Sequence, residues 1–83
     1  MKQIKWRKKA LRQLRKIKNI TTRSAIKNAV GSLTDFPNCQ NVKRLVNHPF
    51  DYRLRIGNWR VLFTESLEII SIEEVKKRNE RTY

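Results

Sequence analysis

Residues 52–63 read YRLRIGNWRVLF and give the clearest structural signal in the sequence. Apolar and polar side chains alternate on both sides of Gly57-Asn58, a dipeptide that suits a two-residue loop because glycine and asparagine tolerate positive φ angles. The pattern predicts a β-hairpin in which Tyr52 lies opposite Phe63. Since side chains alternate along a strand, one face of this hairpin is apolar and is expected to form core. Its members are Tyr52, Leu54, Ile56, Trp59, Val61 and Phe63.

The other face of the hairpin carries three arginines, Arg53, Arg55 and Arg60. The predicted register places Arg55 directly opposite Arg60, and like charges in this position destabilise a hairpin by roughly 0.2–1 kcal/mol. One interpretation is that the arginines only keep the wet face of a half-exposed sheet soluble. We favour a functional interpretation, because three guanidinium groups in one patch can bind an anion with several oxygens, such as a phosphate.

The composition predicts one small and strongly basic domain that spans residues 1–83. The chain has 20 Lys and Arg residues and 7 Asp and Glu residues, a formal net charge of +13. This charge favours polyanions, with RNA and DNA first, an anionic membrane second and an acidic protein third. An acidic partner that masks the charge is expected too, since a free domain this basic would bind cellular nucleic acid indiscriminately.

Cysteine usage and the N-terminal sequence bear on the compartment. Cys39 is the single cysteine, so the chain offers no internal disulfide and suits a reducing compartment. Basic residues are spread through residues 1–19, and no apolar run there is long enough for a signal peptide or a membrane span. We therefore expect a soluble, cytoplasmic protein without a membrane partner.

The first part of the chain predicts one short strand and two helices. Residues 2–6 alternate polar with apolar side chains, which favours a strand. From Arg7 the apolar period becomes helical, and Thr21 or Thr22 offers an N-cap for a second helix that ends before Pro37. The apolar stripes of the two helices are Ala10, Leu11, Leu14 and Ile17, and Ala25, Ile26, Ala29, Val30 and Leu33.

The second part predicts a sheet built around the hairpin. Residues 38–51 are irregular, and residues 69–75 predict a third antiparallel strand. The phase of that strand is ambiguous, because Ile70 and Ile72 share one face while Val75 lies on the other. Together the elements predict an α+β fold, in which two N-terminal helices pack on a small twisted antiparallel β-sheet. Three apolar residues of the irregular segment are expected to reach the core: Val42, Leu45 and Val46.

Several classes of enzyme site are missing from the sequence, which has no glycine-rich phosphate loop, no Cys or His pair at metal spacing and no nucleophile elbow. A metalloenzyme or nucleotide hydrolase is therefore not expected, and no cofactor is predicted. His48 is the only histidine, and we interpret it as a turn residue rather than as a catalytic acid or base. A basic sheet face with aromatic residues suits RNA, whose 2′-hydroxyl can attack the neighbouring phosphorus without a metal.

The hairpin and the order of the elements resemble the RelE/ParE superfamily of bacterial toxin-antitoxin toxins over nearly the whole chain. The resemblance is most specific in Tyr52–Arg55 (YRLR) and Gly57–Arg60 (GNWR), which look like the family's YRLR and G-x-[YW]-R pattern, and in Arg78 and Tyr83. For a RelE-type member it implies a metal-independent endoribonuclease that enters the decoding site of the ribosome and cuts mRNA, leaving a 2′,3′-cyclic phosphate. It also implies a cognate antitoxin, the ribosome and mRNA as partners, and a monomeric toxin unit within the toxin-antitoxin complex.

The same resemblance implies roles for five residues. Arg53 and Arg60 stand at phosphate-binding positions, and Arg55 stands where RelE has a lysine proposed as the general base. Arg78 stands where an arginine is the proposed general acid, and Tyr83 where a tyrosine stacks on a base of the RNA.

Two departures from the family pattern leave alternatives open. A guanidinium stays protonated at physiological pH, so Arg55 would act mainly by charge stabilisation, and the proton would go to another group. The reserve proton acceptors are Glu73, Glu74 and His48, and Arg81 is the alternative to Arg78. Two other functions are also compatible with the sequence: a ParE-type toxin that inhibits DNA gyrase, and a nucleic-acid-binding module without catalysis.

Overall fold

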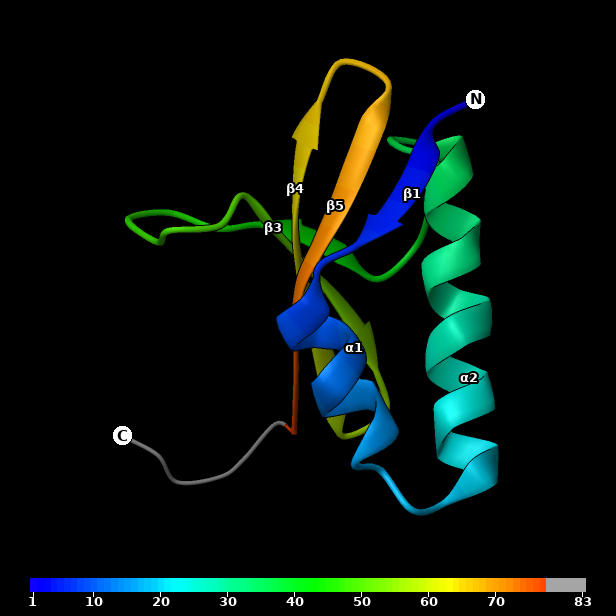
Figure 1. Cartoon of the computed structure of the whole chain (residues 1–83). Helices are drawn as coiled ribbons and strands as arrows, with labels where there is room; N and C mark the ends of the chain where they lie inside the picture. The colour runs from blue at the N-terminus through cyan, green and yellow to red at the C-terminus, as the bar shows by residue number, and fades with distance from the viewer. Residues whose placement is uncertain (78–83) are drawn as a thin grey trace.

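Two helices pack on a five-stranded sheet with the strand order β1-β5-β4-β3-β2 (Figure 1). The structure is a computed structural model and describes residues 1–77, so that Arg78, Arg81 and Tyr83 lie outside the described residues. The predicted α+β class, with helices packed on a small sheet, is confirmed. The elements are β1 (Gln3–Trp6), α1 (Lys8–Arg15), α2 (Ile20–Gly31), the 3-10 helix η1 (Ser32–Asp35), β2 (Val42–Arg44), β3 (Tyr52–Ile56), β4 (Trp59–Ser66) and β5 (Ile69–Lys77).

The hairpin of β3 and β4 forms in the predicted register. Tyr52 pairs with Phe63 and Arg55 with Arg60, and the loop is Gly57-Asn58. Gly57 has a φ of 56°, a value that costs glycine little and that a primed hairpin turn requires at its first position. The local sequence therefore sets which residues face the core.

The core lies between this hairpin, β5 and the two helices. Leu54, Val61 and Phe63 of the hairpin are at most 2% exposed, as the predicted apolar face requires. Tyr52 closes one side of the core by stacking on Phe63, with the ring centroids 5.4 Å apart. The remaining core residues come from the helices, η1, β5 and the residues after α1: Ala10, Leu14, Ile17, Ile26, Val30, Leu33, Ile70, Ile72 and Val75.

The sheet is mixed, which corrects the expectation that it is antiparallel throughout. Strand β1 pairs with β5 in parallel, with Gln3 opposite Ile69 and Trp6 opposite Ile72. The other three pairings are antiparallel. A parallel pair needs a long crossover between its strands. Here the crossover contains both helices and three other strands, so the direction of the pairing could not be read from local sequence.

A β-bulge in β5 resolves the ambiguous phase of that strand. Ile72 pairs with Phe63 and Glu74 pairs with Leu62, so Glu73 is an extra residue with no position of its own on β4. The extra residue shifts the alternation by one. Ile72 and Val75 therefore face the core together, although they are three residues apart.

Helix α1 continues along the edge of β5 where β1 ends. The backbone N–H of Arg7 donates to the carbonyl of Ile72 at 3.0 Å, which extends the parallel pairing by one step. The helix then supplies the next partner through a side chain: the N–H of Val75 donates to Oε1 of Gln13 at 2.7 Å. In Figure 1, α1 lies next to this part of β5. Backbone groups at this edge of β5 thus find hydrogen-bond partners beyond the end of β1 without a further strand.

Three local expectations were wrong. Helix α2 is capped by Asn19, whose side chain accepts a hydrogen bond from the N–H of Thr22, and not by Thr21 or Thr22. The irregular segment contains the short strand β2, which pairs with β3. Val46 is 80% exposed, because the chain leaves the sheet after β2, whereas Val42 packs on the core as expected.

The Gln13 contact can be tested by unfolding. We expect Gln13→Ala to lower the free energy of unfolding by about 1–3 kcal/mol, because it leaves the N–H of Val75 without its partner. Urea denaturation measures the change. Arg12→Ala, on the exposed side of the same helix, is the control and should change stability by less than about 0.5 kcal/mol. Equal effects of the two substitutions would mean that this hydrogen bond does not support the edge.

Candidate functional site

Five cationic side chains gather on the sheet face opposite the core. Arg55, Arg60 and Lys76 form one row across three strands, because Arg55 pairs with Arg60 and Arg60 pairs with Lys76. Lys43 and Arg53 pair in the next outward-facing row, across β2 and β3. We call these five residues the cationic face.

The centre of the cationic face is partly covered. Arg55, Lys43 and Lys76 are exposed, whereas Arg53 is half-buried. Leu62 pairs with Arg53 in the second row and is only 5% exposed, so this face of the sheet is not uniformly wet. Arginine and lysine stems can cover apolar surface while the charged ends stay in water, which explains how a leucine is buried here.

The arginines of the first row have no carboxylate of their own among residues 1–77. The ion pairs of this part of the chain all involve other cations, and neither Arg55 nor Arg60 takes part in one. They are Lys2 with Glu65 at 2.8 Å, Arg7 with Glu73 at 3.4 Å, Lys9 with Glu74 at 2.7 Å and Lys76 with Glu74 at 3.3 Å. The two guanidinium groups are therefore available to an external anion, as the functional interpretation of the sequence requires.

Glu74 is the carboxylate nearest to the cationic face. It pairs with Leu62 in the second row and is 9% exposed. Burial alone would raise the pKa of this carboxyl group, but the hydrogen bond from Lys9 and the charge of Lys76 together outweigh burial and hold the pKa below its ordinary value of 4.5. Glu74 is therefore an anion held between two ammonium groups and a weak proton acceptor.

The other two reserve proton acceptors are also engaged. Glu73, the bulge residue, accepts from Arg7 at 3.4 Å and from the hydroxyl of Thr64 at 3.3 Å. His48 is exposed in the loop between β2 and β3, where its Nδ1 accepts a hydrogen bond from the N–H of Phe50 at 3.1 Å. These contacts give Glu73 and His48 local structural roles, as the interpretation of His48 as a turn residue predicts.

A cavity of about 380 Å³ borders Arg55 at the edge of β3, next to the residues that precede β2. Its lining includes Asn41, whose carbonyl accepts from the N–H of Arg55 at 3.0 Å, and the free thiol of Cys39. Burial raises the pKa of the Cys39 thiol, and the charge of Asp35 raises it further. The thiol is thus less nucleophilic than an ordinary cysteine.

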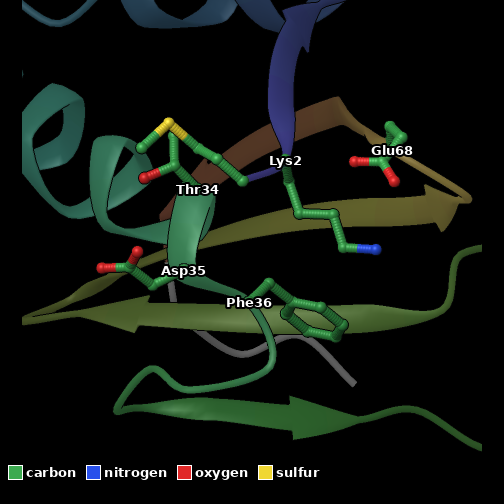
Figure 2. Close-up of a pocket in the computed structure, with 6 residues that line it drawn as sticks. Lys2, Thr34, Asp35, Phe36 and Glu68 are labelled. Atoms are coloured by element: carbon green, nitrogen blue, oxygen red, sulfur yellow. The ribbon is translucent and has the colours of Figure 1, made fainter.

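A second cavity of about 380 Å³ lies beside the start of β1 and shares Asp35 with the first (Figure 2). It is lined by the N-terminal segment, η1 and the β4–β5 turn, and Figure 2 shows the Lys2 side chain pointing away from Asp35. Lys2 is already paired with Glu65. Because Asp35 and Glu68 line this cavity, it suits an anion poorly and is separate from the cationic face.

The structure brings together three of the five residues that the sequence proposed for the site: Arg53, Arg55 and Arg60. Sequence reasoning missed Lys43 and Lys76. Lys43 was missed because β2 was not predicted. The one sequence signal for it is that it follows Val42, which was expected to face the core, so that in a strand Lys43 would face outward. Lys76 was missed because the last strand was predicted to end at residue 75, whereas β5 continues to Lys77 and places Lys76 beside Arg60.

The cationic face can bind a phosphate and stabilise added negative charge on it. Guanidinium groups bind phosphate oxygens in pairs, and a lysine adds a point charge. Within residues 1–77 there is no group of three His, Cys, Asp or Glu side chains that could hold a metal ion. In this part of the chain none of the helices has the length and hydropathy of a membrane span.

The repulsion in the first row predicts that Arg60 lowers stability. Arg60 faces a cation on each neighbouring strand, and each like-charged pair costs roughly 0.2–1 kcal/mol. We expect Arg60→Thr to raise the free energy of unfolding, more at low than at high ionic strength. Lys5→Thr is the control, because Lys5 is an exposed strand cation opposite Ser71. A destabilising Arg60→Thr would mean that Arg60 serves the fold.

The ion pairs of Glu74 predict acid sensitivity. Its pKa is lower in the folded chain than in the unfolded chain. The resulting stabilisation is therefore complete above the ordinary carboxyl pKa and is lost as the pH falls through the folded-state pKa. In urea denaturation between pH 7 and pH 3, Glu74→Gln should flatten the loss of stability with falling pH. Parallel curves for wild type and variant would contradict this.

Comparison with known proteins identifies the family. The family model described as "ParE toxin of type II toxin-antitoxin system, parDE" matches residues 4–82. A search of curated proteins gave no significant match.

Three similar structures are toxins solved alone or with an antitoxin. The isolated Escherichia coli RelE toxin superposes with a TM-score of 0.79 at 18% identity, covering 98% of this chain and 88% of RelE. The RelE-RelB complex of Pyrococcus horikoshii OT3 gives 0.80 at 21% identity, covering 96% and 98%. The RelBE2 complex of Mycobacterium tuberculosis gives 0.79 at 21% identity, covering 93% and 98%. These structures share the fold, and the family match extends over nearly the whole sequence. The chain therefore belongs to the ParE toxin family and is a toxin of a type II toxin-antitoxin system within the RelE/ParE superfamily.

Proposed function

We propose that this toxin is a ribosome-dependent endoribonuclease that cleaves mRNA in the ribosomal A site and so inhibits translation. The observation that carries the proposal is the row formed by Arg55, Arg60 and Lys76 across three strands, in which neither arginine has a carboxylate partner among residues 1–77. This row repels itself in the absence of an anion. A bound phosphate would relieve the repulsion and use all three charges.

The proposed reaction is an internal transfer within the RNA. The 2′-oxygen attacks the adjacent phosphorus, the new oxygen–phosphorus bond closes a 2′,3′-cyclic phosphate, and the bond to the 5′-oxygen of the next nucleotide breaks. The 2′-hydroxyl loses a proton and the leaving 5′-oxygen gains one. The cationic face would hold the phosphate in line and stabilise the negative charge that builds up on its oxygens.

Charge stabilisation is the main contribution that the described residues can make. Arg55 cannot accept the proton, because a guanidinium is protonated at any physiological pH. Glu74 is a poor acceptor, because two ammonium groups hold it as an anion. We propose Arg53, Arg55 and Arg60 as the catalytic residues, with Arg78 and Tyr83, or Arg81 in place of Arg78, as further members from outside the described residues.

The similarity to RelE supports this function over simple nucleic-acid binding. The similar structures are named as RelE toxins, and the hairpin carries the YRLR and GNWR sequences on which the resemblance rests. A net charge of +13 suits an rRNA surface as well as mRNA. If the protein were only a nucleic-acid-binding module, it would bind RNA with strong salt dependence and leave the RNA intact.

We propose an acidic antitoxin as the protein partner. Two of the similar structures are complexes with RelB antitoxins. A chain with this net charge needs a partner of opposite sign to stay inactive and to avoid unspecific RNA binding. The antitoxin would cover the cationic face and leave a monomeric toxin unit within the complex.

Inhibition of DNA gyrase is the second candidate function. The observation that favours it is the family match itself, since the matching family is described by ParE. In that case the cationic face would bind a protein or DNA, and no RNA would be cut.

Toxin induction in cells tests the proposal. Arg60→Ala should abolish growth arrest and lower cleavage on mRNA-programmed ribosomes by about 10²–10³-fold, the loss typical when one group that stabilises the transition state is removed. Sequencing of 5′ ends on ribosome-bound mRNA measures cleavage, and a supercoiling assay with purified gyrase measures the alternative.

The control is Lys5→Ala, which removes an exposed strand cation that does not belong to the cationic face. It should retain both toxicity and cleavage, and thermal unfolding should show that both variants are folded. Full toxicity of a folded Arg60→Ala variant would refute the role of the cationic face. Gyrase inhibition without new 5′ ends would replace the ribonuclease by the ParE-type function.

A further inference from the structure

Among residues 1–77, the two sheet rows that carry the cationic face include one carboxylate, Glu74, and it contacts two lysines. Glu74 lies in the second row and Lys76 in the first, two residues further along β5 and on the same side. Oε1 of Glu74 lies 3.3 Å from Nζ of Lys76, and Oε2 lies 2.7 Å from Nζ of Lys9. Glu74 thus joins α1 to the sheet and holds the outermost cation of the row.

The contact with Lys9 alone would be enough to anchor α1. A buried carboxylate needs a charged partner, and the shorter of the two contacts already supplies one. The contact with Lys76 is therefore not needed to compensate the buried charge of Glu74. Lys76 is exposed, has a flexible four-carbon stem and pairs with Arg60, so repulsion would drive its ammonium group away from the row.

We infer that Glu74 is a positioning residue of the proposed RNA-cleaving site, which holds the ammonium group of Lys76 beside Arg60 for binding to the phosphate. The inference rests on the proposed function, in which Lys76 already belongs to the phosphate-binding row, and adds Glu74 to it. Lys76 is the residue that would contact the phosphate, and Glu74 acts only through it. Since Glu74 is already held by two ammonium groups, a role as positioning residue fits its contacts better than a role as general base.

The first test is Glu74→Gln, which keeps the size of the side chain and removes its charge. We expect kcat on mRNA-programmed ribosomes to fall roughly 10–100-fold, because a charged group is displaced from the reacting phosphate. KM should stay equal or fall, because the variant carries one more net positive charge. Glu65→Gln is the matched control: it breaks another carboxylate–lysine pair and adds the same net charge, but lies at the far end of β4. It should leave kcat unchanged.

The second test asks whether Glu74 acts through Lys76. In a Lys76→Met background, Glu74→Gln should cause no further loss of kcat, whereas in a Lys9→Met background its full effect should persist. Further loss in the Lys76→Met background, or wild-type kcat in Lys76→Met alone, would overturn the inference. If Glu74→Gln does not fold, Glu74→Asp replaces it, since the shorter carboxylate keeps the charge and withdraws it from Lys76.

A third measurement is independent of RNA cleavage. The NMR order parameter of the Lys76 Cε group should fall in folded Glu74→Gln and stay unchanged in Glu65→Gln. If wild type cuts no mRNA but this order parameter falls, the ribonuclease proposal fails while the contact between Glu74 and Lys76 stands. An unchanged order parameter overturns the inference whatever the function of the toxin.

Discussion

The pairing of β3 with β4 sets both the core and the charged surface of this toxin. Once Gly57-Asn58 forms the loop, every residue of the hairpin is committed to one of two faces, and a slip of one residue would exchange them. The same register that buries Leu54 and Phe63 therefore places Arg55 opposite Arg60. Core formation and charge clustering are two consequences of one pairing.

Helix α1 and strand β5 add further charged residues to the surface that the hairpin forms. The helix occupies the edge of β5 through Gln13 and reaches Glu74 through Lys9. Strand β5 in turn extends the row by Lys76. The surroundings of the cationic face thus combine repulsion across strands with one well-placed carboxylate. Unfavourable local interactions of this kind are common at binding sites, because the bound ligand supplies the opposite charge that the free protein lacks.

The sequence was sufficient where the information is local. The loop, the register of β3 and β4 and the common face of Arg53, Arg55 and Arg60 all follow from a period of two residues and one dipeptide. The two helices followed from their apolar stripes. The start of α2 did not follow in the same way, because several residues around position 20 can act as a cap and Asn19 does so.

The expectations that failed depended on distant parts of the chain. The direction of β1 is set by its contact with β5, at the other end of the described sequence. Strand β2 is three residues long and exists only because β3 offers an edge. Because neither β2 nor the last residues of β5 were predicted, the sequence alone did not place Lys43 and Lys76 in the cationic face. Tertiary context decides such short segments more than intrinsic propensity does.

The bulge at Glu73 has a consequence for comparisons between related toxins. The inserted residue reverses the parity of everything that follows it in β5, including Glu74 and Lys76. In a relative without this extra residue, an alignment without gaps would place inward-facing side chains opposite Glu74 and Lys76, which face outward here. Matching outward-facing residues with outward-facing residues requires a one-residue gap at Glu73.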